Sequence, residues 1–193
     1  MKAGLGTITL VVALLVVFGI ELATHSVGNE VSLLKLGALP DNGALHGQYW
    51  RVATYSFLHL NSAHLLVNVL LLFWVGRIVE SWVGIAYAAV IYVSSVLSSA
   101  IVILLFHNLH PKAGATVGAS GGIFGLLAAA LIISYRYGAG GLDREGRLRT
   151  WLWIAFLAGL GISFLPGISM AGHVGGLIGG TLLACIANLR KNV

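Results

Sequence analysis

The chain has 193 residues, of which 58% are hydrophobic and only 9% are charged, and its net charge is +5. A soluble domain has roughly 25% charged residues, so this chain cannot cover a surface that faces water. We therefore expect an integral membrane protein whose length fits one domain, residues 1–193. The basic residues lie at the ends of apolar segments and form no patch with interleaved aromatic residues, which argues against a nucleic-acid partner. The single cysteine, Cys185, excludes an intramolecular disulfide.

Apolar segments follow one another along the chain at about the length of a membrane-spanning helix, which needs about 20 mainly apolar residues. The first, residues 5–23, is longer than the apolar region of a secretory signal, so we interpret it as a spanning helix. A long loop at 24–61 and a charged, glycine-rich loop at 136–148 are the main connections. The sequence predicts an all-α bundle of six transmembrane helices. They are expected at residues 5–23, 62–80, 84–106, 118–135, 149–165 and 169–188.

The positions of lysine and arginine predict the orientation, because cytoplasmic loops carry an excess of both residues. With the N-terminus inside, eight basic residues face the cytoplasm and three face outward. Both termini are therefore expected in the cytoplasm, in a multi-pass protein of the cell membrane. The inner set is Lys2, Arg77, Arg136, Arg144, Arg147, Arg149, Arg190 and Lys191, and the outer set is Lys35, Arg51 and Lys112.

Four polar residues interrupt the apolar segments at one depth. They lie in the first two turns of three segments that all enter from the outer side, within roughly 10 Å of that end at about 1.5 Å per residue. Polar side chains inside a membrane are costly and are by default candidates for function. The charge count that sets the orientation uses none of them, so their convergence is independent evidence for a site. They are His64, Asn68, Ser120 and His173.

Glycines flank the serine and the histidine at spacings that let membrane helices approach closely. Close packing of the fourth and sixth helices could bring His173 within the roughly 3 Å that a serine nucleophile needs from its base. The alternative is that glycine-rich helices only pack tightly and that Ser120 bonds its own backbone. The glycine pairs are Gly118–Gly122 and Gly121–Gly125 around the serine, and the stripe Gly172–Gly176–Gly180 lies beside the histidine.

The first N–H groups of a helix have no partner within the helix. Those near Ser120 can donate hydrogen bonds to the oxyanion of a tetrahedral intermediate. His64 and Asn68 lie one turn apart on one helix face and can add side-chain donors. Hydrogen bonding that only ties their helix to its neighbours explains these two residues equally well.

No aspartate lies in the six segments, so a serine–histidine dyad is a simpler expectation than a triad. An aspartyl intramembrane protease would need two such aspartates, and a zinc protease would show H-E-x-x-H; neither occurs. No thiolate or well-spaced carboxylate joins the histidines that could share a metal site, so we expect neither metal nor cofactor. These histidines are His59 and His64 with His107 or His110.

The sequence resembles the rhomboid family. In that family G-x-S-G opens the fourth core helix, and here Gly118, Ala119, Ser120 and Gly121 follow the pattern. A histidine begins the glycine-patterned sixth helix of the family, as His173 does here. The resemblance covers the chain from the first expected helix to the sixth, in order and in spacing.

Two further motifs carry the resemblance. The second helix of the family carries H-x-x-x-x-H-x-x-x-N, which is matched by His59, His64 and Asn68. The first loop carries a tryptophan–arginine pair, matched by Trp50 and Arg51. G-x-S-G alone is a weak signal, and its combination with the other elements is specific.

The resemblance implies a rhomboid-like bundle of the compact six-helix bacterial type and an intramembrane serine protease without a cofactor. It implies that Ser120 is the nucleophile and His173 the base, and that the Ser120 amide, His64 and Asn68 form the oxyanion hole. Rhomboids cleave single-pass transmembrane proteins, with small residues before the cut and helix-weakening residues after it. The implied partners are such substrates and membrane lipid, and the oligomeric state is not indicated. The implied supporting residues are His59, Gly118, Gly121, Phe124, Gly176, Trp50 and Arg51.

One residue departs from the pattern of some bacterial members, which have a tyrosine four residues after the serine, stacked on the catalytic histidine. Phe124 keeps the aromatic face at this position and loses the hydroxyl. Ring support is therefore expected to survive without any hydrogen bond.

Two other functions compete with proteolysis. A catalytically inactive rhomboid relative would bind membrane clients without cutting them, although such relatives usually lose the serine or the histidine, and both are present here. A small transporter or channel would use the polar cluster for permeation, but the sequence has no internal repeat and the cluster lies away from the membrane centre.

Overall fold

The computed structural model of the chain describes residues 4–137 and 147–186. Most of the expected connection 136–148 and the last two residues of the expected sixth segment lie outside these ranges. So do four of the basic residues that predict the orientation, which are Lys2, Arg144, Arg190 and Lys191.

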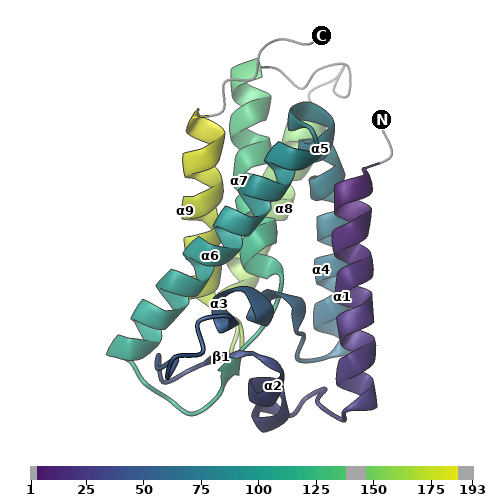
Figure 1. Cartoon of the computed structure of the whole chain (residues 1–193). Coiled ribbons are helices and arrows are strands. Elements are labelled where there is room, and N and C mark those ends of the chain that lie inside the picture. The colour runs from purple at the N-terminus through teal and green to yellow at the C-terminus, as the bar shows by residue number, and fades with distance from the viewer. Residues whose placement is uncertain (1–3, 138–146, 187–193) are drawn as a thin grey trace.

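The described part of the chain is mostly helical, as expected, and its long helices pack side by side in one bundle (Figure 1). The second long helix runs without a break from Ser62 to Val83 and contains one π-helical turn. It consists of α4 (Ser62–Leu71), η2 (Leu72–Gly76) and α5 (Arg77–Val83). The other long helices are α1 (Leu5–Ala23), α6 (Ile85–Leu109), α7 (Ser120–Tyr137), α8 (Arg147–Ile162) and α9 (Met170–Ile186).

Three of these helices are long and apolar enough to cross a membrane: Leu5–Ala23, Ser62–Val83 and Ile85–Leu109. The helices Ser120–Arg136 and Met170–Ile186 are apolar and shorter. A helix of 17 residues is about 26 Å long, slightly less than the roughly 30 Å hydrocarbon core of a bilayer. The chain is an integral membrane protein, and the count of six crossings stays a prediction.

The start of α1 and the end of α9 lie at the same end of the bundle, and the short elements of the first connection lie at the opposite end (Figure 1). These elements are α2 (Glu30–Leu36), β1 (Leu39–Pro40), α3 (Arg51–Thr54) and the 3₁₀ turn η1 (Tyr55–Phe57). The strand β1 pairs antiparallel with β2 (Ala115–Thr116), so that Leu39 lies opposite Thr116. This pairing holds the segment that leads into α7 against the first connection.

Arg51, one of the expected supporting residues, holds this connection together. Its Nη1 donates to the carbonyl oxygens of Leu34 at 2.7 Å and Ala38 at 2.6 Å, which lie at the end of α2 and just beyond it. Its Nε donates to Oε1 of Gln48 at 2.7 Å. The neighbouring Trp50 is exposed. Arg51 therefore has a structural role: it ties separate segments of the first connection to one another.

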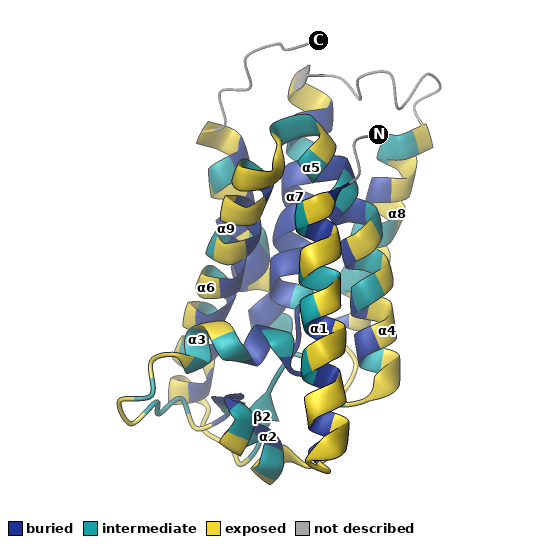
Figure 2. Ribbon diagram, turned by 45° about the vertical axis from the view of Figure 1, so that its right-hand side comes forward, coloured by how far each residue is buried: buried dark blue, intermediate teal, exposed yellow. Residues whose placement is uncertain are grey.

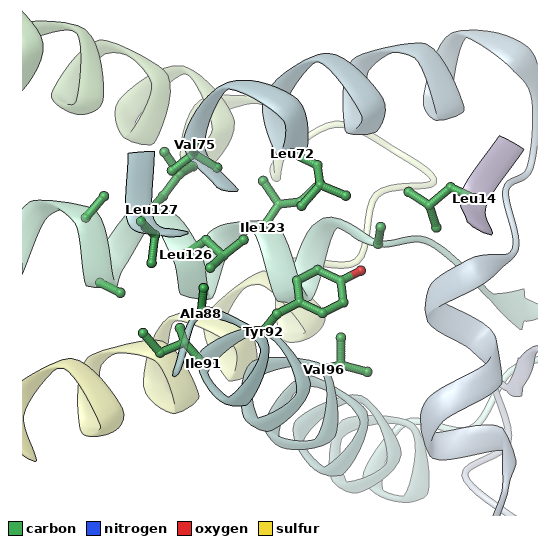
Figure 3. Packing of buried hydrophobic residues seen from close by; sticks show 14 of the residues in the cluster. Leu14, Leu72, Val75, Ala88, Ile91, Tyr92, Val96, Ile123, Leu126 and Leu127 are labelled. Carbon is green, nitrogen blue, oxygen red and sulfur yellow. The ribbon is translucent and has the colours of Figure 1, made fainter. Parts of the chain in front are cut away.

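The helix α7 lies in the middle of the bundle and is buried on nearly all sides (Figure 2). A helix that is apolar all round is expected to lie inside a protein and not at its surface. Residues from η2 and α6 cover α7 from two directions (Figure 3). These contacts fix the helix whose first residue is Ser120. The packed side chains include Leu72, Val75, Ala88, Ile91, Tyr92, Ile123, Leu126 and Leu127.

Candidate active site

Ser120 and His173 are in contact. The hydroxyl oxygen of Ser120 lies 2.9 Å from Nε2 of His173, although the two residues are 53 positions apart in the sequence. Ser120 is the first residue of α7, and His173 lies in the first turn of α9. The serine is half-buried and the imidazole is buried. The two helix starts therefore bring the predicted nucleophile and the predicted base within hydrogen-bonding distance.

Glycines make this approach possible, because they place main chain directly against main chain. A methyl carbon at Gly176 would lie 2.7 Å from the carbonyl carbon of Gly121, and one at Gly180 would contact the main chain of Gly125 as closely. Real Cβ atoms essentially never come within 3.0 Å of another heavy atom. The backbones of α7 and α9 are therefore closer here than any larger residue at these glycines would allow, in agreement with the glycine spacing in the sequence.

The ring of Phe124 stacks on the imidazole of His173, with ring centroids 4.1 Å apart and planes at 14°. Phe124 lies one turn after Ser120 on α7, so one helix supplies both the nucleophile and the support for the base. The expected aromatic support is therefore present without a hydroxyl group.

The second nitrogen of His173 also has a partner. Its Nδ1 lies 2.5 Å from the hydroxyl oxygen of Ser163, a buried residue just after α8. Ser163 in turn donates to the carbonyl oxygen of Gly159 at 2.8 Å. Sequence reasoning missed Ser163. The signal for it was a hydroxyl residue near the end of an apolar segment, at the same end of the bundle as the other polar residues.

His64 and Asn68 gather beside the segment that precedes Ser120. A Cβ at Gly118 would lie 2.9 Å from Nε2 of His64 and 3.9 Å from Nδ2 of Asn68, so both side chains converge on this glycine. Gly118 has a φ of 127°, which L side chains rarely adopt, and its N–H donates to the carbonyl of Tyr55. Glycine is therefore needed here both for the backbone conformation and for the space that His64 occupies.

Asn68 is buried, and its Nδ2 donates to the carbonyl oxygen of His64 at 3.0 Å. This bond lies within its own helix and leaves the second hydrogen of the amide group for another acceptor. His64 is half-buried. Both predicted donors thus lie beside Gly118, which precedes Ser120 by two residues in the chain.

His59 contacts His64 from the segment that precedes α4. Its ring packs edge-on against His64 with centroids 5.1 Å apart, and its backbone N–H donates to Oε1 of the buried Glu21 at 2.9 Å. Burial, together with the nearby His64, lowers the pKa of His59 to about 3, so this imidazole is neutral at physiological pH. His59 therefore acts as a neutral packing residue in the contact between α1 and α4.

The arrangement can carry out nucleophilic chemistry. A serine hydroxyl is a weak nucleophile, and an imidazole nitrogen at 2.9 Å can remove its proton during attack on a carbonyl carbon. Backbone N–H groups at the start of α7 are available to stabilise the charge that develops on the carbonyl oxygen.

Comparisons with known proteins show which family the chain belongs to. The family model of the rhomboid domain matches residues 46–190, which is more than half of the chain. The rhomboid protease GluP of Bacillus subtilis (strain 168) is 33% identical over 182 residues, which cover 92% of this chain and 34% of GluP. RHOMBOID-like protein 1 of Arabidopsis thaliana is 30% identical over 163 residues, which cover 84% of this chain and 41% of that protein. The B. subtilis protein YdcA is 31% identical over 151 residues, 77% of this chain and 72% of YdcA.

The chain spans between a third and a half of the length of GluP and of RHOMBOID-like protein 1. The matched residues include all four polar residues at the starts of α4, α7 and α9. The family model, the relatives and the helical membrane bundle agree, and the chain belongs to the rhomboid family.

Proposed function

We propose that this protein is an intramembrane serine endopeptidase that cleaves single-pass transmembrane proteins within or near their membrane segment. The observation that carries the proposal is the 2.9 Å contact between the Ser120 hydroxyl and His173 Nε2, at the start of two helices inside an apolar bundle. Membership in the rhomboid family supports the same reaction, since GluP is named a rhomboid protease.

The reaction proceeds in two stages. In the first stage Ser120 Oγ attacks the scissile carbonyl carbon while His173 Nε2 accepts the hydroxyl proton. The proton then passes to the leaving amine, the C–N bond breaks, and an acyl group remains on Ser120. In the second stage a water molecule attacks this ester with His173 again as the base, and the carboxylic acid product leaves.

The Ser120 amide, His64 and Asn68 form the oxyanion hole in this proposal. The convergence of both side chains on Gly118 supports the assignment, because it places their donor groups beside the segment that leads into the nucleophile. These donors would stabilise the negative charge of the tetrahedral intermediate and not the ground state.

The orientation belongs to the proposal as well. Six crossings with both termini in the cytoplasm put the starts of α4, α7 and α9 at the outer side of the cell membrane. The positions of the described basic residues Arg77, Arg136, Arg147 and Arg149 support this orientation.

The proposal is tested by reconstituting the purified full chain in liposomes with a single-pass substrate that has small residues before the intended cut and helix-weakening residues after it. The wild type should cleave the substrate, and Ser120→Ala and His173→Ala should not. The double variant should be no less active than either single variant, because residues that act as one unit are not additive.

Ser134→Ala is the matched control. Among the described residues, the hydroxyl of this buried serine donates only to the carbonyl of Leu131 in its own turn of α7, and its loss should leave cleavage intact. Cleavage by purified Ser120→Ala would refute the mechanism. A wild-type protein that binds the substrate without cutting it would favour the inactive client-binding alternative.

A further inference from the structure

The hydrogen bonds around His173 form a chain that includes a residue outside the serine–histidine dyad. Ser120 Oγ lies 2.9 Å from Nε2, Ser163 Oγ lies 2.5 Å from Nδ1, and the Gly159 carbonyl oxygen accepts from Ser163 at 2.8 Å. A neutral imidazole has one protonated and one unprotonated nitrogen. The direction of the chain therefore determines which nitrogen faces the nucleophile.

Only one direction gives every hydroxyl proton an acceptor among the described residues. When Ser163 donates to Gly159, its oxygen accepts from Nδ1–H, and the lone pair of Nε2 accepts from the Ser120 hydroxyl. In the opposite direction Ser163 donates to Nδ1 and Nε2–H donates to Ser120. The Ser120 hydroxyl then has no acceptor in the described structure, and its oxygen faces a proton and not a base.

The local structure favours the first direction. The Ser163 hydroxyl reaches the carbonyl four residues earlier, which is a common bond for serine in a helix. Ser163 is 3% exposed and His173 is 6% exposed, so neither partner is replaced by bulk solvent.

We infer that Ser163 is a positioning residue that holds His173 in the tautomer with the proton on Nδ1, so that Nε2 is free to accept the proton of Ser120. It takes the place that the carboxylate has in a serine–histidine–aspartate triad, with a neutral hydroxyl in place of a charge. The inference rests on the proposed function in that it assigns a role within the same reaction.

The same turn of α8 supports the ring from a second side. A Cβ at Gly159 would lie 2.8 Å from Cζ of Phe124, so this glycine packs against the ring that stacks on His173. The last turn of α8 and the residue that follows it thus fix the edge of the imidazole through Ser163 and its face through Phe124.

The test compares Ser163→Thr with Ser163→Val in the purified full chain. The two side chains have nearly the same shape, and only threonine has the hydroxyl. Ser163→Thr should keep turnover close to wild type, whereas Ser163→Val should lower kcat about tenfold, the equivalent of one lost neutral hydrogen bond, with KM equal in the pair and both variants folded at the assay temperature. Ser134→Ala controls for the loss of a buried serine hydroxyl elsewhere in the bundle.

A second measurement does not depend on turnover. Nitrogen-15 NMR of imidazole-labelled protein, with the His173 signals assigned by their absence in His173→Ala, should find the Nδ1–H tautomer in the wild type and in Ser163→Thr. Ser163→Val should shift the population toward Nε2–H. Equal kcat in the threonine and valine variants, or an unchanged tautomer in Ser163→Val, would overturn the inference.

The two measurements separate this inference from the proposed function. If the wild type cleaves no substrate but shows the Nδ1–H tautomer that Ser163→Val loses, proteolysis fails and the positioning role stands. If the wild type cleaves and Ser163→Val cleaves equally well, proteolysis stands and the positioning role fails.

Discussion

Replacing Gly176 with alanine should separate the two helices that carry the dyad. A methyl carbon at this position would lie 2.7 Å from the carbonyl carbon of Gly121, and ordinary contact begins at 3.4 Å. The shortfall to this atom alone is about 0.7 Å, and the carbonyl oxygen of Gly121 would lie closer still. Both atoms belong to the main chain, so no side chain can rotate away. Adding about 0.7 Å to the 2.9 Å between Ser120 Oγ and His173 Nε2 gives at least about 3.6 Å, which is too long for a hydrogen bond.

A displacement of this size in a catalytic contact costs about 10²-fold in turnover. Overpacking costs about 1–3 kcal/mol of stability, partly offset by the roughly 1 kcal/mol by which alanine is the better helix former. We therefore expect turnover in the liposome cleavage assay to fall about a hundredfold while the protein remains folded, as checked by its melting temperature.

Gly19→Ala is the matched control. Gly19 also lies inside a helix, α1, and a Cβ there would meet nothing within 4 Å. This variant should keep wild-type turnover and melt at the same temperature or slightly higher. A folded Gly176→Ala protein with at least half of the wild-type turnover would refute the argument that main-chain contact between α7 and α9 positions the dyad.

Three further variants test other parts of the site and its orientation. Asn68→Ala should lower turnover about 10²–10³-fold with KM and melting temperature nearly unchanged; near-normal turnover would make Asn68 a scaffold residue. Phe124→Leu should lower turnover up to about tenfold, since an aromatic pair contributes about 0.5–1.5 kcal/mol, whereas the exposed Phe164→Leu should have no effect; equal turnover in the two would contradict the role of the stacked ring. In a Cys185→Ala background, Lys112→Cys should react with an impermeant thiol reagent from outside the cell, and Ser81→Cys should react only after permeabilisation; the reverse labelling would contradict the predicted orientation.

The juxtaposition of Ser120 and His173 could be predicted from the sequence because it depends on helix starts and on small residues. Both residues come early in apolar segments that run in the same direction, and the glycines beside them repeat every four residues. This spacing defines one face of a helix in any context. The structure accordingly places Gly176 against Gly121.

Features that depend on how helices rotate about their axes could not be predicted in the same way. Gly175 and Gly179 place α9 against the main chain of α6, although the sequence only indicated the stripe at Gly172, Gly176 and Gly180. The contact between Ser163 and His173 depends on the angle at which α8 approaches α9, which no spacing within either helix determines.

The first connection was also beyond prediction in detail. Its short strand pairs with residues 115–116, far along the sequence, and two-residue strands leave no periodic pattern. The π-helical turn at Leu72–Gly76 lies inside an apolar run whose composition gives no sign of it.

The most direct test of the central claim is covalent labelling of the purified wild-type protein with a serine-reactive fluorophosphonate, followed by mapping of the modified residue by mass spectrometry. A serine becomes this reactive only when a base activates it, so the adduct should form on Ser120 and should be absent from Ser120→Ala and from His173→Ala. Absence of labelling in folded wild-type protein, or equal labelling of His173→Ala, would contradict the serine–histidine mechanism.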